Sequence, residues 1–337
     1  MPNTIEEIAN YIVADGKGIL AADESSGTIK KRFDSINTES TEENRRDYRE
    51  MLFRASAMSD AIGGVILFDE TLRQNSSDGR PLREVILEQN SLPGIKVDQG
   101  VKPLNEESNE TITSGLDGLD ERCREYDSLG AKFTKWRAVI TINGDSLPTD
   151  ECINQNMEAL ADYALIAQKN NMVPIVEPEI LMDGDHTIDR CFEVTKNTLS
   201  KLYDFLDKKN INIKGTLLKP NMVVSGTNNK VQAPIQEVAE KTLECLRSSI
   251  SNDTPGVVFL SGGQSDIDAT AHLDAMNKIG NFPWKLSFSY GRALQQAALK
   301  TWLGKAENLT AAQEAFNHRA TMNKKAALGE WSSSLEN

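Results

Sequence analysis

Eight short apolar runs recur along the whole 337-residue chain. They begin roughly 30–45 residues apart, which is the spacing of a strand, a helix and the next strand. Most are continuous rather than alternating, as expected of parallel strands that are buried on both faces. The runs cover Gly18–Asp23, Gly63–Phe68, Gly94–Asp98, Phe133–Ile142, Val173–Leu181, Gly215–Val223, Gly256–Gly263 and Lys285–Arg292. The pattern predicts eight buried parallel strands.

The segments between these runs carry helix signals. Ser40 and Glu43 have the spacing of a capping box and predict a helix that continues through Met58. Thr149–Lys169 has one apolar face, and Pro234 suits the first turn of a helix that reaches about residue 249. Two more helices are expected at 267–279, where Ser265 is the cap, and at 310–328.

Strands that alternate with helices eight times favour a closed (β/α)8 barrel, the TIM-barrel architecture, as a single domain over residues 1–337. The alternative is an open doubly wound sheet. That fold usually carries GxGxxG after its first strand, and Gly18–Gly27 lacks this motif. The Ser-rich end, from about residue 329 to 337, is expected to be a short flexible tail.

Charge and composition exclude several classes of function. The net charge is −13, so we expect neither a nucleic-acid nor an anionic-membrane partner. No apolar run reaches the roughly 18 residues of a membrane helix, and the N-terminus lacks the pattern of a signal or transit peptide. A cytoplasmic location is therefore expected. The chain has four scattered cysteines and three scattered histidines, so no metal site and no metal cofactor are expected.

Functional side chains of a (β/α)8 barrel should lie where its strands end. Charged or polar groups occupy that position in seven of the eight runs. Within a strand, residues two apart point the same way, so Lys135 with Arg137, and Glu177 with Glu179, can both face the barrel mouth. Structural ion pairs are the alternative, but so many strand-end charges favour a concentrated site. The other strand-end groups are Asp23, Lys96, Asp98, Lys219, Ser261–Gly263 and Arg292.

The last two runs indicate a phosphate ligand. SGG follows the seventh run and SYGR follows the eighth, and barrels frequently bind phosphate in these two loops. Glycines let backbone N–H groups approach an anion, and Arg292 offers a fork of donors. A second anionic group is suggested after the first run, where Ser25, Thr28 and Arg32 follow the strand. Lys96 and Arg137 could join it, and a solvated helix face is the alternative for 30–32.

A buried lysine and carboxylates suggest covalent chemistry. Lys219 ends an apolar run, and burial beside a second cation such as Lys135 favours the neutral amine. A neutral lysine attacks a ketone and forms a Schiff base, whose iminium serves as an electron sink. Glu177 and Asp23 could handle the protons.

These motifs resemble class I fructose-1,6-bisphosphate aldolase. The likeness runs from GKGILAADES at 16–25 to the helix after Ala311 and covers about nine-tenths of the chain. LLKPN, VPIVEPEI and FLSGGQS occur together in the family's order and are highly specific.

The resemblance implies a role for each matching residue. Lys219 would be the Schiff-base lysine, and Glu177 the acid and base for formation and dehydration of the carbinolamine. Asp23 would take the proton from the C4 hydroxyl. Lys135 would assist proton transfer, and Glu179 would neighbour Glu177. The 1-phosphate side would comprise Ser261, Gly262, Gly263, Ser289, Gly291 and Arg292. The 6-phosphate side would comprise Ser25, Thr28, Arg32 and Lys96, with Arg137 and, more weakly, Arg45 also at the substrate.

The resemblance also implies partners and leaves alternatives open. The ligands would be a phosphorylated ketose and triose phosphates, and the family is typically a homotetramer. A Schiff-base lyase or transaldolase acting on another phosphosugar, and a non-catalytic scaffold, remain alternatives. Many members end in a tyrosine that aids proton exchange, but the last tyrosine here is Tyr290. We therefore expect Glu177, or a water that it orients, to protonate the enamine, and a tail without a catalytic part.

Overall fold

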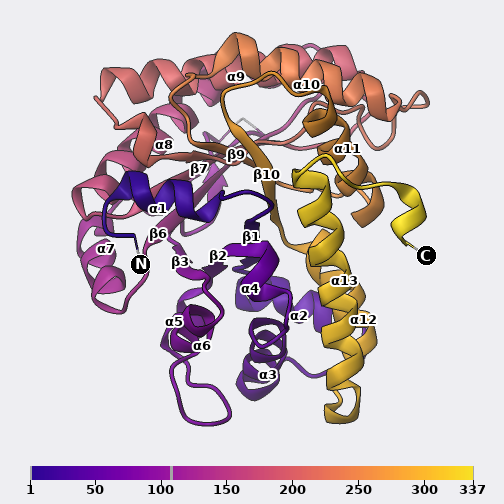
Figure 1. Ribbon diagram of the computed structural model, residues 1–337. Coiled ribbons are helices and arrows are strands. Elements are labelled where there is room, and N and C mark those ends of the chain that lie inside the picture. Colours follow the sequence, from indigo (N-terminus) through magenta and orange to yellow (C-terminus); the bar gives the residue numbers. More distant parts are fainter. Residues whose placement is uncertain (1, 107–108, 337) are drawn as a thin grey trace.

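A closed barrel of eight parallel strands forms the centre of the molecule (Figure 1). The computed structural model describes residues 2–106 and 109–336. Around the barrel the strands follow the order β1-β10-β9-β8-β7-β6-β3-β2. They are β1 (Gly18–Ala22), β2 (Ile62–Leu67), β3 (Leu92–Lys96), β6 (Phe133–Ile140), β7 (Val173–Ile180), β8 (Leu217–Leu218), β9 (Gly256–Phe259) and β10 (Lys285–Tyr290). Each apolar run supplies one strand, which confirms the predicted (β/α)8 barrel.

Helices surround the barrel, and a large cluster of buried apolar side chains fills the space between the two layers. No described helix combines the length and apolarity needed to cross a lipid bilayer. The helices are α1 (Ile5–Ile12), α2 (Ser26–Asp34), α3 (Glu42–Phe53), α4 (Met58–Ala61), α5 (Asp69–Arg73), α6 (Leu82–Glu88), α7 (Leu119–Ser128), α8 (Asp150–Lys169), α9 (Ile188–Lys208), α10 (Ile235–Ser249), α11 (Asp266–Ile279), α12 (Arg292–Trp302) and α13 (Leu309–Ala327). Short 3₁₀ turns cover Ile213–Gly215, Ala306–Asn308 and Ser333–Glu336.

The amino-terminal end of the barrel is closed by α1 and by large side chains. A second apolar cluster joins Ile8 and Ile12 of α1 to barrel residues that include Phe133. A Cβ on Gly63 would lie 2.2 Å from the Ile12 carbonyl oxygen, and one on Gly94 would lie 2.2 Å from the Phe133 ring. Glycine at these two positions therefore lets the helix and the ring pack, so the open end of the barrel is where the strands finish.

The prediction for α3 is wrong at both ends: its cap lies one residue later than predicted, and it ends before the predicted Met58. The cap of α3 is Thr41, whose hydroxyl oxygen accepts the Asn44 N–H at 3.1 Å, rather than Ser40. The helix stops at Phe53, and a separate turn, α4, holds Met58. Both adjacent residues can offer a capping hydroxyl, but only Ser40 has a glutamate three residues later; contacts in three dimensions select Thr41. The other predicted helices are confirmed to within one residue, and Ser265 caps α11 by accepting the Asp268 N–H at 3.0 Å.

A two-stranded hairpin was not foreseen. It pairs β4 (Val101–Pro103) with β5 (Thr111–Thr113) in antiparallel register just after β3. The segment that joins the two strands is polar, and its run of charged and amide residues hides the pairing from a search for apolar runs.

The tail after α13 makes specific contacts. Trp331 is buried, and its backbone N–H donates to Asp274 Oδ1 at 2.9 Å. Glu336 accepts the Trp331 indole N–H at 2.9 Å. The flexibility expected from residue 329 onward stays a prediction, but these contacts favour a docked tail. Residues 1 and 337 lie outside the described part of the chain.

Candidate functional site

A polar cavity of about 930 Å³ opens at the carboxyl ends of the barrel strands. Its volume is typical of a small-molecule site. Fifteen of the seventeen predicted site residues line it. They are Asp23, Ser25, Thr28, Arg32, Lys96, Lys135, Arg137, Glu177, Glu179, Lys219, Ser261, Gly262, Ser289, Gly291 and Arg292.

Lys219 stands at the bottom of this cavity directly after the two-residue strand β8. Its backbone N–H continues the sheet by donating to the Val176 carbonyl at 2.8 Å. Its Nζ lies 3.3 Å from Glu177 Oε1, and both side chains are only 5% exposed. The other carboxylate oxygen of Glu177, Oε2, is buried and accepts no hydrogen bond among the described residues, although Lys135 Nζ lies 3.4 Å away. A buried amine therefore meets a carboxylate that has spare acceptor capacity.

Lys135 is the centre of the charge cluster. Its Nζ lies 2.7 Å from Asp23 Oδ2, 3.4 Å from Glu177 Oε2 and 3.9 Å from Asp98 Oδ2. Burial opposes its charged form, but the surrounding carboxylates hold the pKa of Lys135 above its ordinary value. Burial would likewise raise the pKa of Asp23, but the ammonium groups of Lys135 and Lys219 hold that pKa well below its usual range. Asp23 is therefore a carboxylate at neutral pH and can accept a proton.

The strand register explains why these groups converge. In the β6–β7 pair, Arg137 lies opposite Glu177 and Val139 opposite Glu179. The Arg137 guanidinium forms an ion pair with Glu179. Burial opposes the charge of Arg137, but Glu179 and Glu177 hold its pKa above the ordinary value. The predicted i, i+2 pairs on both strands therefore face the same cavity.

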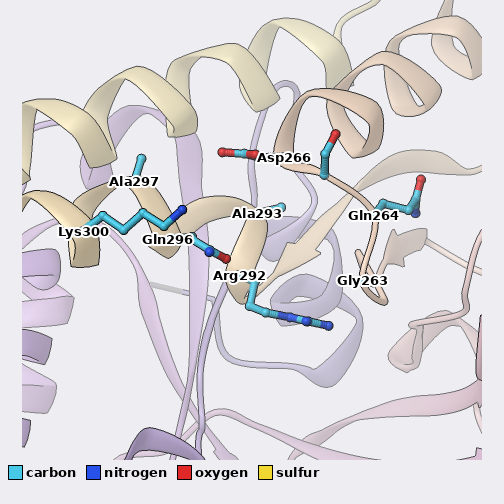
Figure 2. Close-up of a pocket in the computed structure, with 9 residues that line it drawn as sticks. Gly263, Gln264, Asp266, Arg292, Ala293, Gln296, Ala297 and Lys300 are labelled. Carbon is cyan, nitrogen blue, oxygen red and sulfur yellow. The ribbon is translucent and has the colours of Figure 1, made fainter. Parts of the chain in front are cut away.

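The loops after β9 and β10 form an anion-binding corner. Gly262 and Gly263 have φ values of +55° and +103°, which side chains rarely adopt. Figure 2 shows Arg292 and Gly263 beside a smaller pocket of about 520 Å³, and an Arg292 Nη2 lies 3.6 Å from where a Cβ of Gly263 would stand. The Ser289 hydroxyl is buried without a partner among the described residues. Arg292, the glycine backbone and this hydroxyl could together hold a phosphate.

A second group of donors lies after β1. Ser25 precedes α2 and its hydroxyl is 3.1 Å from that of Thr28. Lys96 reaches the same cavity, where its Nζ lies 2.6 Å from Asp98 Oδ1. Arg32 is paired with Glu24 at 2.6 Å.

Arg32 sits between the two phosphate sides. An Arg32 Nη2 lies 3.6 Å from the position of a Cβ on Gly291, so it borders the β10 loop. The sequence resemblance put Arg32 on the 6-phosphate side and Gly291 on the 1-phosphate side. The structure brings the two residues together.

The two remaining predicted residues differ in their placement. Gly263 borders the smaller pocket, beside the main cavity. Arg45 is not among the residues that line the main cavity. Its Nε and Nη2 bind the Glu70 carboxylate at 2.8 and 2.5 Å, which makes it part of an ion pair between α3 and α5.

Two carboxylates of the site had no role assigned from the sequence, although Asp98 was named among the strand-end charges. Asp98 bridges Lys96 and Lys135, and it could have been chosen because it closes the third run. Glu24 is buried and accepts a hydrogen bond at 2.9 Å from Gln295 Nε2, which also donates to the Ala21 carbonyl. Nothing in the sequence marks Gln295, which lies about 270 residues away on α12.

Among residues 2–106 and 109–336, no cluster of three or more histidine, cysteine or acidic side chains is arranged to hold a metal ion. The site combines the buried Lys219 amine, two carboxylates, Asp23 and Glu177, that both contact Lys135, and two groups of hydrogen-bond donors that can bind anions. It suits covalent chemistry on a carbonyl compound that carries two anionic groups.

Comparison with known proteins identifies relatives over nearly the whole chain. A family model described as fructose-bisphosphate aldolase class-I matches residues 4–337. A probable fructose-bisphosphate aldolase class 1 from Xanthomonas campestris is 51% identical over 97% of this chain and 98% of its own. The cytosolic fructose-bisphosphate aldolase 5 of Arabidopsis thaliana is 50% identical over 96% of this chain and 90% of its own.

A solved structure is also similar throughout. The fructose-bisphosphate aldolase of Plasmodium falciparum, crystallised with TRAP and a small-molecule inhibitor, is 46% identical to this chain. The two superpose with a TM-score of 0.96 over 98% of this chain and 95% of the other.

Proposed function

Because the chain belongs to the class I fructose-bisphosphate aldolase family, we propose that Lys219 forms the Schiff base through which it acts. The activity is the reversible cleavage of fructose 1,6-bisphosphate to dihydroxyacetone phosphate and glyceraldehyde 3-phosphate, and the enzyme class is a metal-independent lyase. The observation that carries the assignment of Lys219 is its buried contact with Glu177, 3.3 Å between Nζ and Oε1, at the bottom of the cavity.

Lys219 gives a proton to Glu177, 3.3 Å away, and the free amine attacks the C2 ketone to give a carbinolamine. Glu177 then donates a proton to the departing hydroxyl, so water leaves and an iminium remains. Asp23, held as a carboxylate by Lys135, accepts the proton of the C4 hydroxyl while the C3–C4 bond breaks. The bonding electrons move into the iminium to form an enamine, and the aldehyde triose phosphate departs. Protonation of C3 and addition of water release dihydroxyacetone phosphate and restore Lys219.

The two anion-binding groups fix the substrate across this chemistry. The 1-phosphate lies at the β9 and β10 loops with Arg292, and the 6-phosphate at Ser25, Thr28 and Lys96. The support is the strand order around the barrel. β9 adjoins the Lys219 strand β8 on one side, Lys96 ends β3 beyond β7 and β6 on the other side, and β1 lies beyond β9 and β10, three strands from β8. Holding both phosphates turns the attack on C2 into an intramolecular step.

Borohydride trapping tests the proposal. Fructose 1,6-bisphosphate is added in the presence of EDTA, the mixture is reduced, and the modified peptide is located by mass spectrometry. We expect the reduced adduct on Lys219, and Lys219→Ala should remove both adduct and cleavage. Lys305→Ala, which changes an exposed lysine outside the cavity, serves as the control and should keep both. An adduct on Lys135 or Lys96, or activity that EDTA removes and zinc restores, would overturn the assignment.

We also propose that the protein works as a cytoplasmic homotetramer. The cytosolic relatives of similar length support the location. The homotetramer that is typical of the family supports the assembly. Light scattering after size-exclusion chromatography tests the assembly, because a monomeric mass would contradict it.

A further inference from the structure

We propose that Glu336 is a positioning residue for the phosphate-binding loop after β9, acting through Arg319 and the first turn of α11. The inference rests on the proposed function, since that function assigns the 261–263 loop to the 1-phosphate.

The phosphate loop and α11 are continuous. The Gln264 N–H donates to the Ser261 carbonyl at 2.9 Å, which closes the loop, and Ser265 directly after it caps α11. Figure 2 shows Gly263 and Asp266 on this segment, facing the same pocket as Arg292. A displacement of the first turn of α11 therefore moves the loop relative to Arg292.

Arg319 holds that first turn from α13. Its Nη2 donates to the Asp266 carbonyl at 3.2 Å and to the Thr270 hydroxyl oxygen at 2.6 Å. Asn323 completes the contact, because its Oδ1 accepts from the Thr270 hydroxyl at 2.8 Å. The Arg319 side chain is only 5% exposed, so its charge needs a partner inside the protein.

Glu336 is that partner. Its Oε2 pairs with Arg319 Nη1, and it is also 3.1 Å from His318 Nε2. Its Oε1 accepts the Trp331 indole N–H at 2.9 Å. Burial opposes ionisation of Glu336, but these hydrogen bonds outweigh it and lower the pKa of the carboxyl below its ordinary value.

The tail reaches this position along α11. Asp274 accepts the Trp331 backbone N–H, and Lys278 Nζ donates to the Trp331 carbonyl at 2.7 Å. The tail thus contacts the second half of α11 directly and, through Arg319, its beginning. Loss of the Glu336 charge would leave a buried guanidinium uncompensated, and Arg319 would turn toward water and release the first turn of α11.

The test compares Glu336→Gln with wild type and with Glu330→Gln, a matched change at an exposed tail carboxylate. The readouts are kcat and KM for fructose 1,6-bisphosphate, and the inhibition constant of inorganic phosphate as a competitor. We expect Glu336→Gln to raise KM and the phosphate inhibition constant together by about 2- to 30-fold. The kcat should stay within twofold, and Glu330→Gln should match wild type.

A second variant pair tests the route. If Glu336 acts through Arg319, adding Glu336→Gln to Arg319→Met should cause no further rise in KM. Unchanged KM and phosphate inhibition in Glu336→Gln overturn the inference, even if its melting temperature falls, because a merely structural contact would give that result. Additive effects in the double variant overturn the route through Arg319. Failure of the wild type to cleave fructose 1,6-bisphosphate would instead count against the proposed function.

Discussion

At the scale of single residues, Lys135 determines which groups of the site carry protons. It contacts Asp23 and Glu177 at once, and both its own raised pKa and the lowered pKa of Asp23 follow from these contacts. A buried carboxylate without such a cation would favour its neutral form. Lys135 therefore keeps Asp23 in its carboxylate form across the neutral range.

Lys135→Met should slow cleavage and move the acidic limb of the pH profile. The variant leaves buried carboxylates without their cation, so the pKa of Asp23 rises and its carboxylate persists only at higher pH. We expect kcat to fall by at least about 100-fold and the acidic limb of kcat to shift upward. Steady-state rates from pH 5 to 9 measure both. Lys132→Met, at a lysine that is 40% exposed just before the same strand, is the control. An acidic limb at its wild-type position would show that Lys135 does not set the charge of Asp23.

Arg292→Ala tests the phosphate corner. Loss of a charge-assisted pair costs about 1.5–3 kcal/mol, so kcat/KM should fall roughly 10- to 150-fold. Lys300→Ala is the matched change two turns farther along α12, beside the smaller pocket, and should leave kcat/KM within twofold. Equal losses in both variants would move the phosphate from the main cavity to the smaller pocket.

The site residues that could be predicted are those that end strands. Asp23, Lys135, Glu177 and Lys219 interrupt apolar runs, and this position alone sends them to one rim. Residues that reach the site from a helix distant in the sequence do not interrupt an apolar run, so the sequence gives no signal for them. Gln295 is an ordinary helix residue until α12 packs beside β1, where its amide binds Glu24.

At the scale of elements, continuous apolar runs in the sequence predicted the eight strands. Capping residues predicted the helix ends less accurately at α3. Buried strands are recognised by length and continuity, which survive packing. The choice between Ser40 and Thr41 as a cap depends on how the chain enters α3. The β4–β5 hairpin is polar and exposed at Val101, so neither period nor burial predicts it.

Gly94→Ala tests the packing that shapes the barrel. Its new methyl group would lie 2.2 Å from the Phe133 ring, so the ring must move inside a closed barrel. We expect a loss of about 1–3 kcal/mol in the free energy of unfolding, measured by urea denaturation. Gly27→Ala is the control, because its added methyl group has no atom within 4 Å apart from its chain neighbours and the backbone of its own helix. That variant should be neutral or stabilised by up to about 1 kcal/mol, since alanine favours helix. Similar losses in both variants would contradict this account.

At the scale of the whole molecule, charge is distributed unevenly. The chain carries a net charge of −13, but seven basic and six acidic residues line the main cavity. A sugar bisphosphate carries about −3 to −4 at neutral pH. It therefore meets a cavity mouth of nearly balanced charge on an acidic protein, and at 0.1 M salt the charges within about 10 Å decide its approach. The sequence predicted this concentration of cations because the basic residues end strands. Four acidic residues, Asp23, Asp98, Glu177 and Glu179, also end strands, so the near balance of charge was visible in the sequence as well.

We expect the free energy of unfolding to fall as the pH is lowered, because titratable groups bind protons more readily in the unfolded chain. Burial lowers the pKa of His272 to about 4, so the unfolded chain binds a proton near its ordinary value of 6.5 while the folded chain does not. The unfolded state therefore holds more protons between pH 6.5 and 4, and stability is lost as pH falls through this range. The carboxyl groups of Glu50 and Glu70 act in the same direction at lower pH. Burial opposes ionisation of Glu50, but hydrogen bonds from Ser77 and Arg54 lower its pKa, and Arg45 lowers that of Glu70.

The free energy of unfolding, measured by urea denaturation at successive pH values, should be nearly constant from pH 8 to 7. It should then fall, with a contribution from His272 of up to about 1.4 kcal/mol per pH unit. His272→Asn removes this titration while keeping a donor for Gln264, whose Oε1 lies 2.6 Å from the His272 Nδ1. The slope between pH 6.5 and 4.5 should therefore be shallower in the variant than in wild type. Equal slopes would mean that His272 takes up its proton in the folded state as readily as in the unfolded one.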